Sequence, residues 1–282
     1  MKDSTKLVSI VLGSYNRLRY LKLALATVRN EMADSGLTYE IIVVDGGSTD
    51  GSMAWLCKQK DIITIVQHNR GKWRGRSIER RSWGYFMNLG FKIAQGKHIC
   101  MISDDCLVVP GAIRNGVAFL ERELAAGKKI GGVAFYWRNW PELGDYWVGL
   151  TFGGKMILNH GLLLRNALQE IGFIDEDSYS FYHADGDLCL RLWKAGYEIV
   201  DCPQSFIEHH GDANTRVRQG NLERQHRDWL TYSSRWEPVF GPITRDNVLL
   251  EFSDPAQTSR FFGDARLEIL KRRVWRRLAR IF

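Results

Sequence analysis

Two adjacent carboxylates, Asp104 and Asp105, have the residue type and position expected of a cation site. They follow an apolar run that starts near residue 97, and Pro110 turns the chain away soon afterwards. Such a run predicts a buried strand, and open α/β sheets bind ligands at the carboxyl ends of their strands. Because neighbouring carboxylates repel, the pair needs a proton or a cation, and hard oxygen ligands suit Mg²⁺ or Mn²⁺ shared with substrate phosphates. The alternative is a solvated turn.

A second pair of carboxylates, Asp185 and Asp187, precedes apolar residues that recur at helical spacing from Leu188 onward. At a helix N-terminus the dipole favours an ionised carboxylate. A carboxylate of this kind in a cleft can act as a general base toward a hydroxyl group. Helix capping, a common role of aspartate, is the alternative.

Two histidines and an aromatic loop add further candidates. His209 and His210 follow an expected strand at 198–203, so that an imidazole can join a metal held by the carboxylates, unless the pair merely lies on the surface. Trp147 lies in the aromatic-rich segment 138–154, where its ring can stack on a sugar or simply pack.

Alternating strands and helices are predicted to position these groups, which implies parallel strands with right-handed crossovers. Strands are expected at 7–12, 40–45, 62–66, 97–102, 130–137, 156–165 and 198–203, and helices at 18–31, 52–60, 82–95, 111–126, 166–171 and from 188.

Polar loops that open helices follow the first two strands, and backbone N–H groups at a helix N-terminus favour a diphosphate. The first loop contains Ser14, Tyr15 and Asn16, whereas Asp45 ends the second strand and can hydrogen-bond a ribose or a base edge. Arg80 ends a basic segment that can clamp phosphates or remain a solvated loop. Neither GxGxxG nor GxxxxGK[ST] occurs in these loops, which argues against a dinucleotide-binding fold and a P-loop.

The composition is that of a globular protein. The 282 residues are 45% hydrophobic and 25% charged, enough for one large α/β domain or two small ones. The net charge of +7 suits an anionic ligand, a nucleic acid or an anionic membrane. Five cysteines without a CxxC pair indicate free thiols. No signal-peptide core and no apolar run of roughly 20 residues is present, so a cytoplasmic protein is expected.

The end of the chain is expected to be an extension, so that one domain covers 1–235 and the remainder covers 236–282. Residues 236–255 lack a regular pattern, and 264–282 predict a basic amphipathic helix. Such a helix can lie on the anionic cytoplasmic face of a membrane, or it can pack against the protein itself.

Read together, several motifs resemble the family 2 glycosyltransferases, which have the GT-A fold. The opening strand and loop resemble that family's start, and a second strand and loop are very close to its nucleotide-binding segment. The later segments resemble the approach to its DxD metal site and its acceptor-side ED motif. In chain order these motifs lie at 8–17, 41–52, 88–105 and 173–197.

The resemblance implies a mostly parallel central sheet with helices on both faces, followed by the C-terminal helical extension. It implies an inverting transfer of sugar from a nucleoside-diphosphate sugar to a hydroxyl of a glycan or a lipid-linked saccharide in polysaccharide biosynthesis, with Mn²⁺ or Mg²⁺ as cofactor. The implied roles are a catalytic base at Asp185, metal ligands at Asp105 and His209, a donor site at Ser14, Tyr15, Asn16, Asp45, Arg80 and Asp104, and an acceptor or supporting shell at Asp187, Trp147 and His210.

Two positions depart from the family pattern. Ser103 replaces the first acid of the DxD motif, and Ala184 replaces the glutamate before Asp185. The alternatives are a sugar nucleotidyltransferase and a non-catalytic protein that binds a nucleotide sugar or another anion. No nucleic-acid motif is present, so no nucleic-acid partner is expected.

Overall fold

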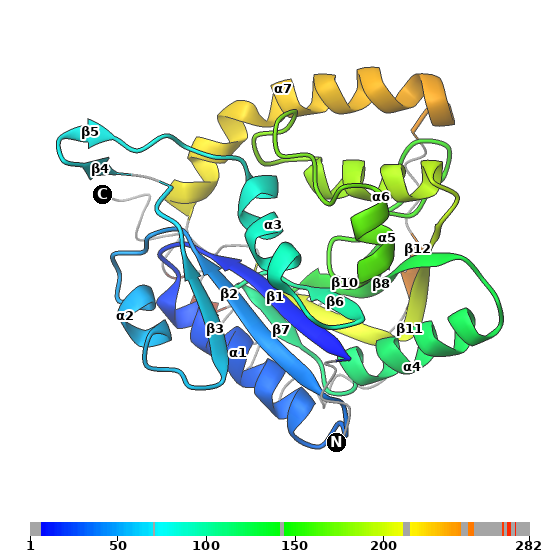
Figure 1. The fold of residues 1–282 in the computed structure, drawn as a ribbon, viewed down its shortest axis with the longest axis horizontal. Coiled ribbons are helices and arrows are strands. Elements are labelled where there is room, and N and C mark those ends of the chain that lie inside the picture. Colours follow the sequence, from blue (N-terminus) through cyan, green and yellow to red (C-terminus); the bar gives the residue numbers. More distant parts are fainter. Residues whose placement is uncertain are drawn as a thin grey trace.

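The computed structural model describes residues 7–69, 71–141, 144–210, 215–243 and 248–250, together with 267, 270, 271 and 274. Within these residues a ten-stranded sheet forms the centre of the molecule, in the order β12-β9-β8-β10-β6-β1-β2-β3, with β11 beside β8 and β7 beside β11 (Figure 1). A separate two-stranded sheet pairs β4 with β5.

The strands are β1 (Val8–Ser14), β2 (Tyr39–Asp45), β3 (Ile62–Val66), β4 (Lys72–Trp73), β5 (Arg76–Ser77), β6 (His98–Met101), β7 (Cys106–Val108), β8 (Ile130–Asn139), β9 (Tyr146–Val148), β10 (Gly161–Leu164), β11 (Glu198–His209) and β12 (Val248–Leu250). The helices are α1 (Leu18–Ala33), α2 (Ser52–Leu56), α3 (Trp83–Ile93), α4 (Ala112–Ala125), α5 (Arg165–Glu170), α6 (Ala184–Lys194) and α7 (Thr215–Phe240).

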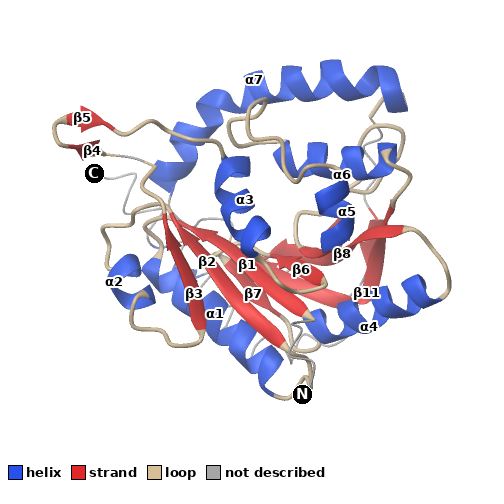
Figure 2. Cartoon of the chain, viewed as in Figure 1, coloured by secondary structure: helices blue, strands red, loops and turns tan. Residues whose placement is uncertain are grey.

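Helices cover both faces of the sheet, because alternate residues of its strands point to opposite sides. On β1, Ile10 packs in one apolar cluster with Leu21 and Leu25 of α1. Its neighbour Val11 packs in the other cluster, with Phe91 of α3. Figure 2 shows the resulting layers, with α1 and α4 on one side of the sheet and α3, α5, α6 and α7 on the other.

The sheet is less parallel than the sequence predicts. Parallel pairings join β6, β1, β2 and β3, as expected for crossover connections. However, β10 lies between β6 and β8 and is antiparallel to both, and β9 is antiparallel to β8 and β12. The predicted parallel pairing thus holds for these N-terminal strands and for β11 with β8, whereas β9, β10 and β12 add antiparallel pairs, because long-range packing sets their direction.

Strand β10 is also shorter than the expected 156–165. Met156 forms only an isolated bridge with Leu150, and regular pairing begins at Gly161. The intervening residues form a loop that carries Asn159 toward the site described below. Helix α2 likewise ends at Leu56 and not at residue 60.

The segment that starts at Trp236 is expected to be irregular, but its first residues belong to helix α7. The helix continues through Phe240 and ends at Gly241, whose positive φ of 84° is a common helix terminus. The predicted boundary between residues 235 and 236 therefore lies inside a helix.

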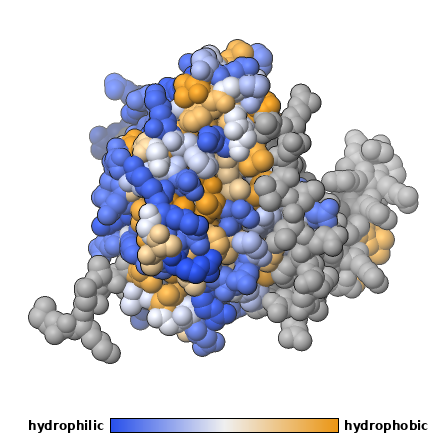
Figure 3. Space-filling model, turned by 90° about the vertical axis from the view of Figure 1, so that its right-hand side faces the viewer, coloured by the Kyte–Doolittle hydropathy of each residue, from blue (hydrophilic) through white to orange (hydrophobic). Residues whose placement is uncertain are grey.

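Most of the predicted tail helix lies outside the described residues. Those that are described, Leu267, Leu270, Lys271 and Val274, are helical and exposed, and the predicted membrane contact stays a prediction. No helix within the described residues is long and apolar enough to cross a bilayer. On the face drawn in Figure 3, the described surface mixes hydrophilic residues with small apolar areas, as protein surfaces normally do.

Candidate active site

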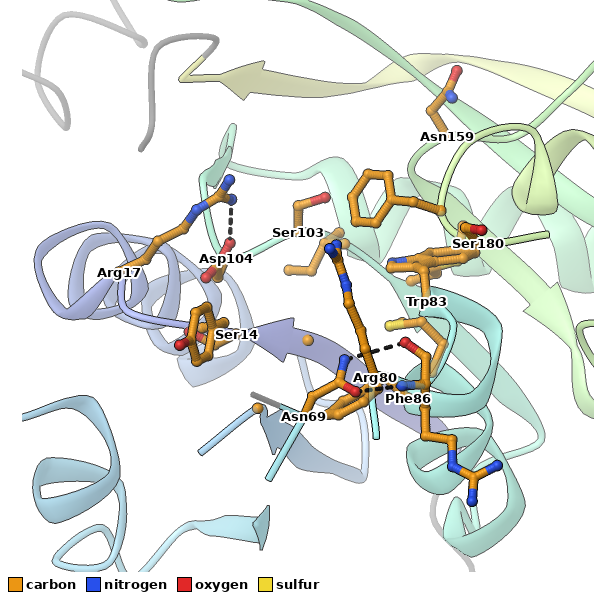
Figure 4. Close-up of a pocket in the computed structure, with 18 residues that line it drawn as sticks. Ser14, Arg17, Asn69, Arg80, Trp83, Phe86, Ser103, Asp104, Asn159 and Ser180 are labelled. Atoms are coloured by element: carbon orange, nitrogen blue, oxygen red, sulfur yellow. Dashed lines mark hydrogen bonds and ion pairs between the residues drawn. The ribbon is translucent and has the colours of Figure 1, made fainter. Parts of the chain in front are cut away.

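A cavity of about 180 Å³ opens where β1 and β6 end, facing the start of α3. Figure 4 shows side chains converging on it from β1, from the segment after β6 and from α3. The lining residues are Gly13, Ser14, Tyr15, Arg17, Gly46, Asn69, Arg80, Arg81, Trp83, Phe86, Met87, Met101, Ile102, Ser103, Asp104, Asn159, Ser180 and Phe181. The site thus lies at the carboxyl ends of parallel strands, as predicted.

The acidic pair after β6 is buried and shares one cation. The Nη1 atom of Arg17 lies 2.8 Å from Asp104 Oδ1 and 2.7 Å from Asp105 Oδ2. Burial raises the pKa of Asp104 to about 6, although Arg17 pulls it down; the charge of Asp105 raises it further. Arg17, which the sequence analysis missed, is therefore the counter-charge of this pair.

Two oxygens of the pair have no hydrogen-bond partner among the described residues, although they are buried: Asp104 Oδ2 and Asp105 Oδ1. The second lies 3.6 Å from His209 Nε2. Carboxylate and imidazole together suit Mn²⁺, and Mg²⁺ takes carboxylates with substrate phosphates. The described residues contain no cluster of three or more potential ligands, so the arrangement fits a metal only with a donor diphosphate completing its ligands.

Strand alternation decides which of the two histidines faces the acids. His209 ends β11 with its imidazole toward Asp105. The His210 ring points toward Tyr20 and Trp140, with ring centroids 5.1 and 4.9 Å away, and its backbone N–H donates to the Asp105 carbonyl. The predicted role therefore fits His209, whereas His210 supports the backbone of the acidic turn.

Behind these residues lies a buried histidine that the sequence analysis did not select. The Nε2 atom of His160 is 3.5 Å from Cys106 Sγ, and its ring is 6.0 Å from that of His209. Burial, together with the nearby His209, lowers the pKa of His160 to about 3. His160 is thus neutral at physiological pH and adds no charge to the site.

Asp185 does not line the cavity, but it contacts a residue that does. It occupies the first turn of α6, where its Oδ2 atom accepts a hydrogen bond of 2.9 Å from Nδ2 of Asn159. Its Oδ1 atom accepts from the Gly186 N–H, also at 2.9 Å. Because Asn159 itself lines the cavity (Figure 4), this hydrogen bond connects Asp185 to the cavity wall.

Asp187, two residues further on, has a different environment. It is fully buried and accepts hydrogen bonds from Tyr179, Arg191, Arg235 and Trp236, at 2.8–3.0 Å. These contacts join α6 to α7, and the buried carboxylate is not accessible to an acceptor saccharide. Of the two roles predicted for Asp187, acceptor contact or support, the contacts favour support, and the role stays a prediction.

The predicted donor residues differ in how they meet the cavity. Ser14, Tyr15 and Arg80 line it, and in Figure 4 the Arg80 side chain extends between Ser14 and Trp83. Asn16 does not line it; its Oδ1 atom instead accepts from the Thr49 N–H at 2.7 Å, joining the two loops.

Asp45 lies just behind the cavity wall at Gly46. Its Oδ1 atom accepts from the N–H groups of Gly47 and Ser48, at 2.9 and 2.7 Å. Its Oδ2 atom is buried without a hydrogen-bond partner in the described part of the chain.

Trp147 lies away from the cavity, on β9. Its ring contacts that of Trp137, with centroids 4.0 Å apart, and Trp137 in turn meets the His209 ring at 5.7 Å. The predicted sugar contact is therefore not seen at the cavity itself, and the contacts support a packing role beneath the histidine.

One further residue was missed because its signal is not local. Asp228 of α7 is buried, and it accepts three backbone hydrogen bonds of 2.9 Å from Ser180, Phe181 and Tyr182. Since Ser180 and Phe181 line the cavity, α7 fixes part of its wall.

The fold is the GT-A fold of nucleotide-sugar glycosyltransferases, and comparison with solved structures agrees. The mannosyltransferase PcManGT from Pyrobaculum calidifontis, solved with GDP-Man and Mn²⁺, superposes with a TM-score of 0.57 at 17% identity, over 83% of this chain and 65% of that one. TarS 1–349 from S. aureus, solved with UDP-GlcNAc, gives a TM-score of 0.56 at 13% identity, over 75% and 60%.

Residues 9–143 match the family model described as "Glycosyl transferase family 2", so this part of the chain is similar to that family. An uncharacterized glycosyltransferase of Nostoc sp. is 27% identical over 43% of this chain and 34% of its own length. The uncharacterized protein y4gI of Sinorhizobium fredii is 22% identical over 89% of this chain and 30% of its own length. The chain thus spans about a third of these curated relatives. The comparisons favour a glycosyltransferase over the two alternatives considered from the sequence.

Proposed function

We propose that this chain transfers a sugar from a nucleoside-diphosphate sugar to a hydroxyl group of a glycan or a lipid-linked saccharide, with inversion at the anomeric carbon. One observation carries the proposal: a single cavity is lined by Asp104, whose acidic pair has two buried oxygens without a hydrogen-bond partner among the described residues, and by Asn159, which donates a hydrogen bond to Asp185. The nucleotide sugars bound to PcManGT and TarS support this class of donor.

The donor would occupy the cavity with its diphosphate toward Arg80. A guanidinium group pairs well with phosphate oxygens because its N–H donors form a planar fork. Ser14 and Tyr15 lie on the same wall. The Oδ2 atom of Asp45, which has no hydrogen-bond partner among the described residues, would accept a hydrogen bond from the base or the ribose. A small movement of the Gly46 loop would expose this oxygen to the donor.

Asp105 and His209, assisted by Asp104, would hold Mn²⁺ or Mg²⁺ against the donor diphosphate. When bound, the ion neutralises negative charge on the leaving nucleoside diphosphate. The protein's part is to keep the Asp105 Oδ1 atom and the His209 imidazole on one side of that diphosphate, 3.6 Å apart in the free protein.

Asp185 would act as the general base. It takes the proton of the acceptor hydroxyl while that oxygen bonds to the anomeric carbon, and the bond from this carbon to the diphosphate breaks with its electron pair leaving on phosphate. Displacement in a single step from the opposite face inverts the anomeric centre. The hydrogen bonds from Asn159 and the Gly186 N–H fix the carboxylate for this task.

The test is release of nucleoside diphosphate from a panel of nucleotide sugars with Mn²⁺ present. We expect one donor to release its nucleoside diphosphate slowly, with the sugar passing to water, and faster when the correct acceptor takes the sugar. We expect Asp105→Asn to lower the rate about 100-fold, because several kcal/mol of charge stabilisation is lost. Asp34→Asn, which removes an exposed carboxylate at the end of α1, is the matched control. A folded protein that neither binds nor hydrolyses any donor would refute the proposal.

A further inference from the structure

The Arg17 guanidinium lies between the two carboxylates that would hold the metal. One nitrogen, Nη1, is within 2.8 Å of both Asp104 and Asp105. The two carboxylate side chains are only 4% and 8% exposed, against 20% for Arg17. A contact of this kind is strong because charged hydrogen bonds gain from a poorly solvated setting.

Arg17 also faces the donor. It follows the loop of Ser14 and Tyr15 and precedes the first turn of α1, and its side chain lines the same cavity (Figure 4). The long, flexible arginine side chain can therefore reach either the acidic pair or a diphosphate bound in the cavity. Both are anionic, and a guanidinium pairs with carboxylate and with phosphate oxygens.

We propose that Arg17 couples donor binding to metal binding: it neutralises the acidic pair while the cavity lacks a donor and pairs with the diphosphate when the donor arrives. The inference rests on the proposed function, since it assumes a diphosphate donor. Two carboxylates and one guanidinium leave a single net negative charge, and a divalent cation placed there meets the positive charge of Arg17 at close range. Once Arg17 has moved, both carboxylates attract the cation.

This arrangement predicts opposite effects on two ligands when the charge of Arg17 is removed. For Arg17→Gln we expect Mn²⁺ alone to bind about tenfold more tightly, because the competing cation is gone. We expect UDP or GDP, added with EDTA, to bind about tenfold more weakly, because a phosphate partner is gone. A general disturbance of the site would weaken both ligands.

The experiment measures Mn²⁺ by electron paramagnetic resonance of the free ion and UDP and GDP by calorimetry, with Arg19→Gln as control. Arg19 is exposed on the same helix, so this variant loses the same charge away from the acids. Mn²⁺ affinity of Arg17→Gln equal to or below that of the wild type would overturn the coupling. The wild type gives a second test, because equal Mn²⁺ affinity with and without saturating nucleoside diphosphate would also overturn it.

Failure of the proposed function gives a distinct result. In that case neither the wild type nor Arg17→Gln binds UDP, GDP or a nucleotide sugar under any metal condition. If nucleotides bind but the two affinities do not move in opposite directions, only the role of Arg17 is wrong.

Discussion

The acidic pair after β6 and the acidic residues around α6 and α7 are similarly buried, but their hydrogen bonds are satisfied to different degrees. Asp104 and Asp105 share one guanidinium nitrogen, and two of their buried oxygens have no hydrogen-bond partner among the residues that the structure describes. Asp187 accepts four side-chain hydrogen bonds, and Asp228 accepts three from the backbone.

This difference distinguishes carboxylates that stabilise the fold from carboxylates that remain available to a ligand. A buried carboxylate with all its hydrogen bonds made holds elements together, whereas one with bare oxygens costs stability unless a ligand supplies the missing partners. The cluster of Asp187 and Asp228 thus fastens α6 and α7 to the fold. The pair of Asp104 and Asp105 is the place where we propose that a ligand binds.

The largest expected effect is on catalysis at Asp185, which lies two residues from Asp187 but near the cavity. Asp185→Asn should lower turnover about 10²–10⁴-fold, because a general base is lost, while donor affinity changes little. Unfolding by urea should change by about 1 kcal/mol or less, since only the hydrogen bonds to Asn159 and Gly186 are altered. Turnover like that of the wild type would exclude Asp185 as the base.

In contrast to Asp185→Asn, Asp187→Asn should lower the stability of the fold. The amide retains one acceptor oxygen but loses the charge that Arg191 and Arg235 face, so we expect unfolding to become about 3 kcal/mol easier. Urea unfolding measures this directly, with Asp185→Asn as the matched variant. If Asp185→Asn and Asp187→Asn lower the free energy of unfolding equally, the proposed difference between a structural carboxylate at 187 and a catalytic one at 185 is wrong.

The smallest effect is on the pH dependence of folding stability, which should have opposite signs in the two regions. Burial raises the folded pKa of Asp104 to about 6 in spite of Arg17. The folded state then holds this proton more tightly than the unfolded chain, so the stabilisation is present at low pH and is lost as the pH rises through about 6. Asp104→Asn cannot ionise, and its melting temperature should rise relative to the wild type between about pH 4 and pH 7.

Asp175, which belongs to the α7 side, should behave oppositely. Burial alone would raise its pKa, but hydrogen bonds from Arg235 and Ser178 hold the pKa well below its usual range. Its stabilisation is therefore present above the unfolded pKa of about 3.8 and is lost as the pH falls. Asp175→Asn should melt below the wild type at neutral pH and approach it under acid conditions. Parallel pH profiles for the two variants would contradict this assignment.

The sequence by itself determined the elements that depend on local pattern. Apolar runs placed β1, β2, β3 and β6 within a residue or two, because a strand covered on both faces must be apolar along its length. The same runs placed Asp45 at the end of β2 and Asp105 in the turn after β6, and helical spacing placed Asp185 in the first turn of α6. The family resemblance added their roles.

Only the tertiary structure decided which side chains meet. Arg17 and Asp104 are 87 residues apart, and Asp228 lies 46 to 48 residues from the loop that it holds. The reversal of β10 and the choice of His209 over His210 likewise follow from pairing with distant strands. Local periodicity encodes where a strand or helix lies, but a buried charge selects its partner from everything that the fold brings near, and no short stretch of sequence contains that information.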